Sequence, residues 1–446
     1  MSLSPLVKWT GGKRSELPVL VPLFPPFKRI VEPFCGGAAV SFHVQAPKTV
    51  LNDASQPLIS FYKTIKSQAS KERFFTHLET INSVRKEIKT FVERLPDKKV
   101  QEWFAAPENK KKALMNRIES AVWWNLLPQD LRLQAKKDAV KSTMDKTQVR
   151  IPALLKKNSS TVFSVSDLRQ HLETGLQSGF YTLLRRIYNK EKPFLTYLGK
   201  NPEMLTAAWF AVRSLCYSGM FRYGKNGALN VPYGGIGYNT RVFNMGVFKN
   251  KKLVKFFKST SLSCGDFQKL FEEYDYFNQD DFVFLDPPYD SAFSQYNPEG
   301  DFDAKEQKRL SEECLKLKSP WMMVIKNTPF ILSLYDKPGL HHAVFGKNYQ
   351  VNFRNRHDRG VEHLIITNYP LPVDAEGIAV IDAKTHFASS QKPVLSKKEA
   401  VKKEPAGAAK KIKNPAKKNI SPSPVKTTTK PKSKATSTST SKKDNS

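Results

Sequence analysis

The chain has 446 residues, 40% of them hydrophobic, and a formal net charge of +31, so it can hold a sizeable core in two or three average domains or in one α/β domain with insertions. Its positive charge far exceeds what solubility requires and indicates a polyanionic partner. Because we find no apolar run long enough to span a bilayer and no signal peptide, we expect nucleic acid rather than a membrane.

The N-terminal part alternates short apolar runs with helical patterns. The run at 29–32 precedes a glycine-rich turn, and a helix is expected from 39 to about 45. A second short strand, 49–51, ends at Asn52-Asp53 and is followed by a helix from about 56 to 67. A strand, a glycine-rich turn, a helix and a strand with an acidic end are typical of a nucleotide-binding βαβ unit.

The stretch from about Lys71 to Thr260 lacks this alternation. Residues 71–160 carry 20 Lys or Arg against 11 Asp or Glu and have the pattern of amphipathic helices, among them 113–127 with its Trp123-Trp124 pair. A nucleic-acid-binding insertion and a solvated helical subdomain explain this part equally well.

Strand patterns return after that stretch. The apolar runs 261–264, 282–285, 321–325 and 363–367 have the length and composition of buried strands. We expect them to complete one sheet with the N-terminal strands.

The C-terminal part, from about 390 to 446, is a lysine-rich tail. From Gln391 to Ser446 it holds 16 lysines and three acidic residues, a charge of +13. Such a segment cannot bury enough apolar surface to offset its chain entropy, so we expect it to be disordered. Its lysines would add salt-sensitive, non-specific attraction to DNA.

The cysteines and histidines give no sign of a metal site. The four cysteines are scattered and form no C-x-x-C pair, which favours a reducing compartment. His341 and His342 lack partners at ligand spacing and are expected at the surface. We therefore expect no metal ion.

The tetrapeptide 286–289 carries the most specific chemistry. The exocyclic amine of adenine is a poor nucleophile, and it must be held and polarised before it can accept a methyl group. The Asp286 carboxylate can accept one N–H of this amine, and the carbonyl of Pro287 can accept the other. Tyr289 offers a face on which the purine can stack. Taken alone, a proline turn after a strand explains the motif equally well.

Two glycine-rich clusters precede this motif. Residues 6–13 combine the indole of Trp9, two lysines and a Gly pair, and Lys13 could meet a carboxylate. In the second cluster, 32–40, small residues let the backbone approach a ligand in front of a helix N-terminus. Asp53, at the end of the next strand, stands where nucleotide sites bind ribose hydroxyls.

The order of these motifs resembles one family. Lys-Trp-x-Gly-Gly-Lys at 8–13, Glu-Pro-Phe-x-Gly-Gly-Ala-Ala-Val at 32–40, Asn-Asp at 52–53, Gly-Asp-Phe at 265–267 and Asp-Pro-Pro-Tyr at 286–289 are similar to the Dam-type DNA adenine methyltransferases, the α-class amino-methyltransferases. Their joint occurrence in this order is very specific. The likeness spans roughly residues 5–70 and 178–370.

The resemblance implies S-adenosylmethionine as methyl donor and double-stranded DNA as partner. It assigns donor contacts to Trp9, Lys13, Phe34, Gly36, Gly37, Asp53, Asp266, Phe267 and Asp286. By the same likeness, Asp286, Pro287 and Tyr289 form the catalytic motif. The methyl group then moves in a direct in-line displacement, and the proton leaves the nitrogen afterwards.

The segment from about 213 to 238 resembles the target-recognition hairpin of this family. By that likeness Tyr217 wedges into the duplex, Arg222 reads a guanine through O6 and N7, and Pro232 touches a base edge. Ser218 and Met220 depart from the Asn and Leu that are usual there. GATC or a related site is therefore the leading expectation for the target, whose adenine must be flipped out of the helix.

The expected fold is α/β, with a Rossmann-like methyltransferase sheet, an inserted and mostly helical target-recognition domain, and a disordered basic tail. We expect a discontinuous catalytic domain at 1–70 and 250–372, and an insertion at 71–249. An intracellular location with DNA follows, and the tail suggests a nuclear or viral setting. The sequence does not indicate an oligomeric state.

Two other functions stay open at this point. A lysine tail like that of histones also suits a catalytically silent DNA-binding or packaging protein with a relic methyltransferase fold. A changed acceptor, such as cytosine, RNA or a glutamine side chain, is the second alternative. The Asp at position 286 favours adenine over these acceptors.

Overall fold

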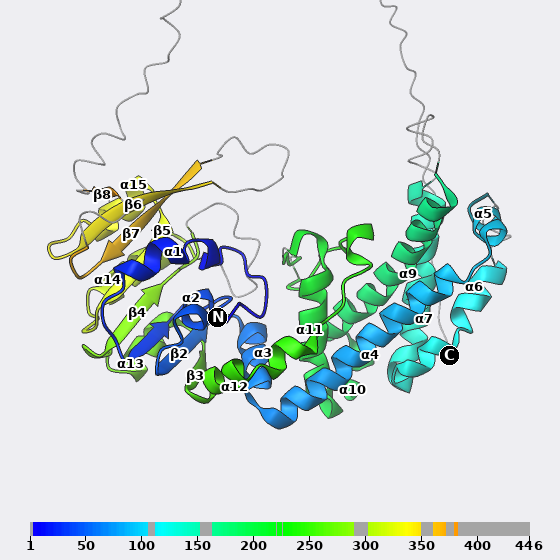
Figure 1. The fold of residues 1–446 in the computed structure, drawn as a ribbon, viewed down its shortest axis with the longest axis horizontal. Helices are drawn as coiled ribbons and strands as arrows, with labels where there is room; N and C mark the ends of the chain where they lie inside the picture. The colour runs from blue at the N-terminus through cyan, green and yellow to red at the C-terminus, as the bar shows by residue number, and fades with distance from the viewer. Residues whose placement is uncertain are drawn as a thin grey trace, which may run out of the picture. The chain divides into compact units, whose positions relative to one another are not determined.

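The computed structural model describes residues 3–105, 112–151, 163–219, 221–224, 226–289, 302–348, 360–371 and 379–381. Within these ranges eight strands form one sheet, in the order β3-β2-β1-β4-β5-β7-β6-β8 (Figure 1). The strands are β1 Arg29–Glu32, β2 Lys48–Asp53, β3 Thr260–Cys264, β4 Asp281–Leu285, β5 Trp321–Lys326, β6 His341–Asn348, β7 Gly360–Thr367 and β8 Ala379–Ile381.

The sheet joins strands from both ends of the sequence, as expected. Strands β3, β2, β1, β4 and β5 are parallel, and Val31 of β1 is in register with Val50 of β2 and Val283 of β4. Strand β7 is antiparallel to both β5 and β6. All six predicted apolar runs that could be strands are strands, whereas β6 and β8 were not predicted. The expected α/β methyltransferase-like sheet is therefore confirmed.

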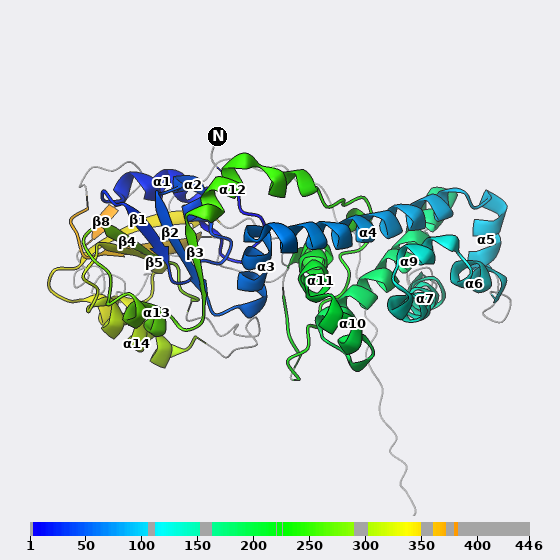
Figure 2. The same cartoon turned by 90° about the horizontal axis from the view of Figure 1, so that it is seen from below.

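Both faces of the sheet are covered, which explains why the central strands β4 and β5 are buried along almost their whole length. On one face Ile30 and Phe282 pack with α1 (Leu17–Leu20) and α2 (Ala39–Val44). On the other face Val31 and Val283 pack with α13 (Phe267–Glu273), α14 (Ala304–Cys314) and α15 (Pro329–Tyr335). Figure 2 shows α1 and α2 on one side of the sheet and α13 and α14 on the other.

The second histidine of the 341–342 pair is not at the surface. His342 lies in β6 and is 5% exposed, and its Nε2 is 3.1 Å from the carbonyl oxygen of Tyr335. The surface location expected for His342 was therefore wrong. The preceding residue, His341, is half-buried.

The chain between β2 and β3 is mostly helical in the described residues. Ser67 ends α3 and accepts a hydrogen bond from the backbone N–H of Ser70, so it also caps the long helix α4. The helices of this part are α3 Gln56–Lys66, α4 Gln68–Glu93, α5 Asp97–Ala105, α6 Lys112–Glu119, α7 Gln129–Met144, α9 Val165–Tyr188, α10 Leu195–Lys200, α11 Pro202–Leu215 and α12 Lys251–Lys258.

The tryptophan pair belongs to the core of this helical part. Helix α6 ends at Glu119, before the residue 127 that we expected, and Trp123 and Trp124 lie in a 3-10 turn, Val122–Leu126. Both indoles are buried, and Nε1 of Trp124 donates to the carbonyl of Ile118 at 2.6 Å. These two rings therefore stabilise the helical packing and offer no surface to a nucleic acid.

Helices α7 and α9 pack with their backbones in close contact. A Cβ atom at Gly179 of α9 would lie 2.4 Å from Cα of Ala139 in α7, and one at Gly175 would lie 2.9 Å from Cα of Thr143. Only glycine fits such an approach. The spacing of these glycines, one turn apart, fixes α9 against α7.

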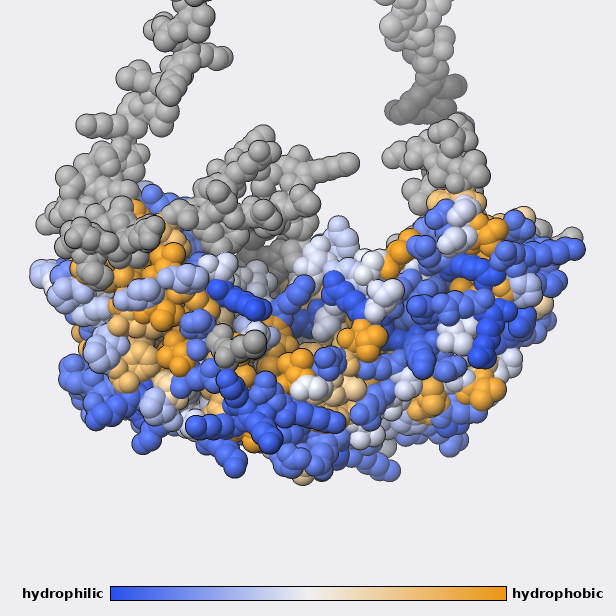
Figure 3. Space-filling model, in the orientation of Figure 1, coloured by the Kyte–Doolittle hydropathy of each residue, from blue (hydrophilic) through white to orange (hydrophobic). Residues whose placement is uncertain are grey.

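Helix α12 returns the chain to the sheet and is strongly amphipathic. Leu253, Phe256 and Phe257 are buried, whereas four lysines, Lys251, Lys252, Lys255 and Lys258, are exposed. Figure 3 shows hydrophilic side chains over this helix. Among the helices of the described segments, none is long and apolar enough to cross a membrane.

Candidate active site

The predicted ligand and catalytic motifs meet at one edge of the sheet. Strands β1 and β4 are parallel neighbours, and the chain leaves β1 toward β2 on one side and β4 toward β5 on the other. In α/β sheets, ligands bind at the carboxyl ends of strands at such a switch point. The loop with Gly36 follows β1, and Asp286 follows β4.

The loop after β1 is held by both backbone groups of Gly36. Its N–H donates to Oδ2 of Asp53 at 2.9 Å, and its carbonyl accepts from the hydroxyl of Tyr62 at 2.8 Å. Gly36 has φ +46°, and a Cβ atom there would lie 2.7 Å from Cδ1 of Trp9. Both the left-handed backbone and the space therefore require glycine.

Asp53 and Asn52 connect three loops at this edge. Oδ1 of Asp53 accepts from the backbone N–H of Ser55 at 2.9 Å. The amide nitrogen of Asn52 donates to the carbonyls of Pro33 and Gly265, at 2.9 and 3.0 Å. Burial raises the pKa of Asp53 above its ordinary value, against the lowering effect of its two backbone donors. The carboxylate keeps unused lone pairs for further donors.

Besides Gly36, a buried arginine also packs against Trp9. The guanidinium of Arg213 in α11 lies 4.0 Å from the centre of the Trp9 ring and 4.5 Å from that of Phe221. Nε of Arg213 donates to the carbonyl of Lys8 at 2.8 Å. Burial lowers the pKa of Arg213 to about 10. Sequence motifs gave no signal for this residue.

Asp266 is engaged by an arginine that the motifs did not reveal. Arg309 of α14 donates to both Asp266 oxygens, at 2.8 and 2.7 Å, and lies 4.2 Å above the centre of the Phe267 ring. This ion pair lowers the pKa of Asp266. Phe34 and Phe267 lie with their ring centres 5.5 Å apart. The predicted contacts Phe34, Asp266 and Phe267 are thus brought together.

Lys13 joins the N-terminal motif to the tetrapeptide 286–289. It is 2% exposed and pairs with Oδ1 of Asp286, whose side chain is 22% exposed. Its ammonium also donates to the hydroxyl of Tyr289 at 3.2 Å. Burial raises the pKa of Asp286, and the charge of Lys13 opposes that rise. Lys13 was expected from the sequence to meet a carboxylate, and in the structure this carboxylate is the side chain of Asp286.

Two further residues hold the tetrapeptide. The amide of Gln307 in α14 donates to the carbonyl of Pro288 at 2.7 Å, and Gln307 is fully buried. His363 of β7 lies with Nε2 3.5 Å from the hydroxyl of Tyr289. Neither residue belongs to a sequence motif, because each is brought in by the packing of a distant element.

The predicted recognition hairpin forms as two paired segments. Cys216 pairs with Tyr233 and Tyr223 with Leu229 as antiparallel bridges. The backbone N–H of Tyr217 donates to the carbonyl of Pro232 at 2.9 Å, so these two predicted DNA contacts lie side by side. The Tyr217 side chain is 53% exposed.

The other recognition residues are also accessible where the structure describes them. Ser218, Arg222 and Pro232 are exposed, and Ser218 has the left-handed φ of 57°. Met220 lies outside the described residues. Pro287 and Gly37 are buried, and no described contact bears on their predicted roles. The catalytic, donor-binding and DNA-reading roles of all the site residues stay predictions.

Helix α9 anchors the hairpin. The hydroxyl of Tyr181 donates to the carbonyl of Val231 at 2.7 Å, and the side chain of Asn189, just after α9, exchanges two hydrogen bonds with the backbone of Leu229, at 2.9 and 3.2 Å. The hydroxyls of Tyr188 and Tyr223 are 3.1 Å apart. The inner side of the hairpin is therefore fixed, and its accessible residues are carried on a rigid support.

Comparison with known proteins agrees with this geometry. A sequence model of the D12 class N6 adenine-specific DNA methyltransferase family matches residues 9–129 and 144–348. The chain belongs to this family. It is an adenine-specific DNA methyltransferase, and this family favours adenine over the other acceptors.

Named relatives cover much of the methyltransferase. It is 31% identical over 208 residues to the type II methyltransferase M.CviBI of Paramecium bursaria Chlorella virus NC1A, a match that covers 45% of this chain and 76% of the relative. Over 388 residues it is 23% identical to the type II methyltransferase M.MjaIII of Methanocaldococcus jannaschii, which covers 83% of this chain and all of the relative. A shorter match, 38% over 80 residues, is to the DNA N-6-adenine-methyltransferase of Escherichia phage P1 and covers 17% and 11%.

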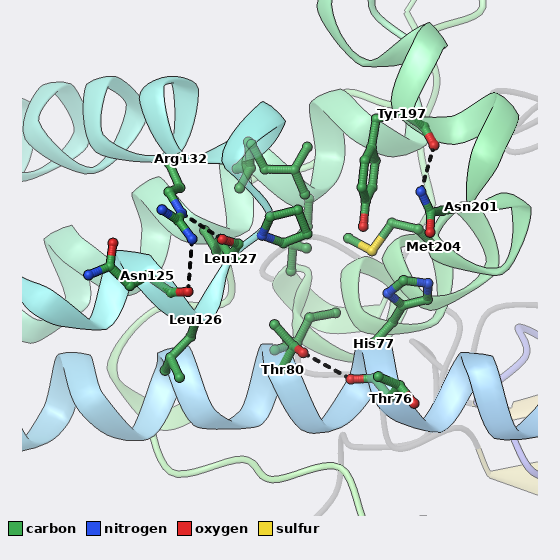
Figure 4. A pocket seen from close by; sticks show the side chains of 15 residues that line it. Thr76, His77, Thr80, Asn125, Leu126, Leu127, Arg132, Tyr197, Asn201 and Met204 are labelled. Carbon is green, nitrogen blue, oxygen red and sulfur yellow. Dashed lines mark hydrogen bonds between the residues drawn. The ribbon is translucent and has the colours of Figure 1, made fainter.

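A separate pocket of about 530 Å³ lies in the helical part of the methyltransferase. Figure 4 shows Thr76, His77 and Thr80 of α4 opposite Tyr197 and neighbouring residues. Its polar groups largely bond within the chain; Arg132, for example, donates to the carbonyls of Leu127 and Asn125, at 2.7 and 3.1 Å. No predicted site residue lines this pocket.

The described part of the methyltransferase offers no group of three or more His, Cys, Asp or Glu side chains that could hold a metal ion. The predicted lysine-rich tail, 390–446, lies outside the described residues. The domain boundaries that we expected stay predictions.

Proposed function

We propose that the enzyme transfers a methyl group from S-adenosylmethionine to the exocyclic nitrogen of an adenine that is flipped out of duplex DNA. One observation carries this proposal. The Asp286 carboxylate is held by Lys13 beside the ring of Tyr289, at the carboxyl end of β4 and next to the Gly36 loop. The proposed acceptor groups and the proposed donor loop are therefore on neighbouring strands.

Asp286 would hold the target amine. Because Lys13 takes Oδ1, Oδ2 is available to accept an N–H of the amine. A carboxylate that accepts this bond draws electron density toward the nitrogen, which makes the lone pair a better nucleophile. Burial alone would favour the protonated acid, and the charge of Lys13 works against that. Tyr289 would stack on the flipped base and fix the angle of attack.

The residues near the Gly36 loop fit a nucleoside-containing donor. Asp53 and Asp266 are carboxylates at the ends of the neighbouring strands β2 and β3, and they suit ribose hydroxyls and an adenine amine. Phe34 and Phe267 add apolar ring surface beside Asp266. S-adenosylmethionine supplies an electrophilic methyl group on its sulfonium. The donor contacts of Trp9, Gly36 and Gly37 belong to the same proposal. Lys13 would take part through Asp286, to which it donates.

The hairpin would read the DNA. An exposed Arg222 can bind O6 and N7 of a guanine in the major groove, and an exposed Tyr217 can fill the space that a flipped adenine leaves. Pro232, hydrogen-bonded to Tyr217 through the backbone, would meet a base edge. GATC is the proposed target, with Ser218 and Met220 as the positions that could shift it.

The decisive experiment is the methylation of defined duplexes by the purified enzyme with labelled donor. We expect N6-methyladenine, found by mass spectrometry of the digested DNA, in GATC-containing duplexes. Asp286→Ala should abolish the product and leave DNA binding intact. A random-duplex pool, sequenced for methyladenine, then gives the context. No methyladenine in any of these duplexes would overturn the proposal.

A further inference from the structure

A buried histidine and a buried glutamate lie behind the catalytic tetrapeptide. His363 of β7 is fully buried and Glu16 is 3% exposed. Nδ1 of His363 lies 3.3 Å from Oε2 of Glu16, and Nε2 lies 3.5 Å from the hydroxyl of Tyr289. We propose that the Glu16–His363 pair positions Tyr289 for methyl transfer, an inference that rests on the function proposed above.

The donors and acceptors of this cluster form one consistent chain. The ammonium of Lys13 donates to the hydroxyl of Tyr289. That hydroxyl still has its own proton, which it can donate to Nε2 of His363. The remaining ring nitrogen, Nδ1, then carries the proton that Glu16 accepts. With Nδ1 as the donor to Glu16 and Nε2 as the acceptor, His363 fixes the direction of both hydrogen bonds at the Tyr289 hydroxyl.

Lys13 and Glu16 reach this cluster from one local turn. The 3-10 turn Lys13–Ser15 ends at Glu16, whose backbone N–H donates to the carbonyl of Lys13 at 2.9 Å. Side chains three residues apart in such a turn lie on the same side. Lys13 therefore points to Asp286 and Tyr289, and Glu16 points to His363.

The three protons of Lys13 have three acceptors. They go to Asp286, to the Tyr289 hydroxyl and to the carbonyl of Gly11 at 3.3 Å. An ammonium has three donors, so this lysine is fully used. If a substitution at His363 displaced the Tyr289 hydroxyl, Lys13 would lose one of these acceptors. The position of Lys13, and with it its contact with Asp286, would then change as well.

The histidine ring itself is held from two sides. Its centre is 5.8 Å from that of Tyr289 at 77°, and 5.3 Å from that of Phe345 in β6 at 81°. These edge-to-face contacts restrict rotation of the imidazole. The Glu16–His363 pair can therefore hold the Tyr289 hydroxyl in one position, because rotation of the imidazole would disturb β6 or Tyr289.

A double-mutant cycle on methylation tests the proposal. His363→Gln should lower kcat by roughly 10- to 100-fold and change KM for DNA by less than about threefold. The reason is that the variant misplaces Tyr289 during methyl transfer and does not weaken DNA binding. Tyr289→Phe keeps the ring and removes the hydroxyl. If His363 acts through that hydroxyl, the double variant should have the kcat of Tyr289→Phe alone. Effects that multiply would overturn the proposal.

A matched control comes from the adjacent strand. His342→Gln replaces another buried histidine, whose Nε2 contacts the carbonyl of Tyr335, away from the tetrapeptide. We expect a loss of stability similar to that of His363→Gln and less than a twofold change in kcat. An equal loss of kcat in both variants would contradict positioning and indicate a general packing effect.

A second variant keeps the test decisive if His363→Gln does not fold. Glu16→Gln retains an acceptor oxygen and removes the charge, and it should lower kcat by roughly 3- to 10-fold in the wild-type background only. The same fall in the Tyr289→Phe background would overturn the proposal.

The wild-type arm separates the two claims. If the wild type methylates DNA and the kcat losses of His363→Gln and Tyr289→Phe multiply in the double variant, the positioning role of His363 fails and the proposed function stands. If the wild type yields no methyladenine, the proposed function fails, and urea unfolding of the wild type and the three variants of the cycle decides on the contact between His363 and Tyr289. Absence of coupling between His363 and Tyr289 in that unfolding would overturn the inference as well.

Discussion

The guanidinium of Arg213 lies over the indole ring of Trp9, 4.0 Å from its centre. Helix α11 thereby fixes the N-terminal segment that carries Lys13, and the same arginine donates to the carbonyl of Lys8. A buried cation–π contact contributes about 1–2 kcal/mol. The helical part of the chain thus takes part in shaping the donor end of the site.

Removal of this clamp should weaken donor binding. We expect Arg213→Leu to reduce the affinity for S-adenosylmethionine by roughly 5- to 30-fold in calorimetry, because the Trp9 ring loses its support. Arg241→Leu is the matched control, since Arg241 lies 3.6 Å from the Tyr238 ring at another place. Equal losses in both variants would contradict a specific role of Arg213.

Gly36 should not tolerate even one methyl group. Gly36→Ala places a side chain at φ +46° and brings Cβ within 2.7 Å of Trp9. We expect a loss of roughly 1–3 kcal/mol in the free energy of unfolding, measured in urea. Gly199→Ala in α10 is the control, because no atom lies within 4 Å of its Cβ, and its effect should be neutral or slightly stabilising. A stable Gly36→Ala would show that Trp9 moves freely.

Lys13 should control the acid limb of the pH–rate profile. Burial raises the pKa of Asp286 and Lys13 opposes the rise. In Lys13→Gln the pKa of Asp286 should therefore rise further, so Asp286 is protonated at higher pH and the acid limb of kcat/KM moves upward. Lys28→Gln breaks an exposed ion pair with Asp280 and should leave the limb in place. If the acid limb of kcat/KM lay at the same pH in Lys13→Gln and in the wild type, Asp286 would not be the group that accepts the N–H of the target amine.

Glu32 should make stability depend on pH. Burial raises its pKa from the ordinary 4.5 to about 7, although it accepts from the backbone N–H of Ser41 at 2.8 Å. Between these values the folded chain binds a proton that the unfolded chain does not, so the free energy of unfolding falls as pH rises through this window.

The variant Glu32→Gln removes this dependence. Its free energy of unfolding relative to wild type should increase by roughly 2–3 kcal/mol between pH 4.5 and pH 8, measured by urea unfolding at several pH values. A constant difference across this range would show that folding does not raise the pKa of Glu32.

Arg222 should carry sequence preference and not general affinity. Arg222→Lys keeps the charge and loses the bidentate geometry, so it should cost about 1–3 kcal/mol of discrimination at one guanine and leave the salt dependence of DNA binding unchanged. Arg222→Ala should lose the same discrimination and leave the salt slope nearly unchanged, because a contact to a base edge neutralises no phosphate. Methylation of duplexes with single substitutions measures the preference. An unchanged preference in both variants would exclude Arg222 as the reader.

The strands that were predicted correctly are continuous apolar runs buried on both faces, such as 282–285 and 321–325. Strand β6 escaped prediction because its three apolar residues at 343–345 are flanked by histidines, a glycine and a lysine. The second of those histidines, His342, is nevertheless buried. Periodicity records hydrophobicity, and a buried hydrogen-bonded imidazole is invisible to it.

The site was predicted wherever residues form a motif on one loop. Lys13, Asp53 and Asp286 were found in this way. Arg309 and His363 were not, because each is defined by a contact with a residue more than 40 positions away, as the separation of 43 positions between Asp266 and Arg309 shows. Such contacts exist only after helices and strands have packed, and no spacing in the sequence encodes them.

The Lys13–Asp286 contact joins residues 273 positions apart, with the whole helical stretch between β2 and β3 enclosed. The entropy of closing so long a loop rises only with the logarithm of its length, about 0.6 kcal/mol per doubling, so the catalytic sheet can carry this stretch at little thermodynamic cost. The cost is kinetic, since pairing of β1 with β4 must wait for a distant segment to arrive. The chain should therefore acquire its helices early and its catalytic competence last, so a partly folded nascent chain would be unable to methylate DNA.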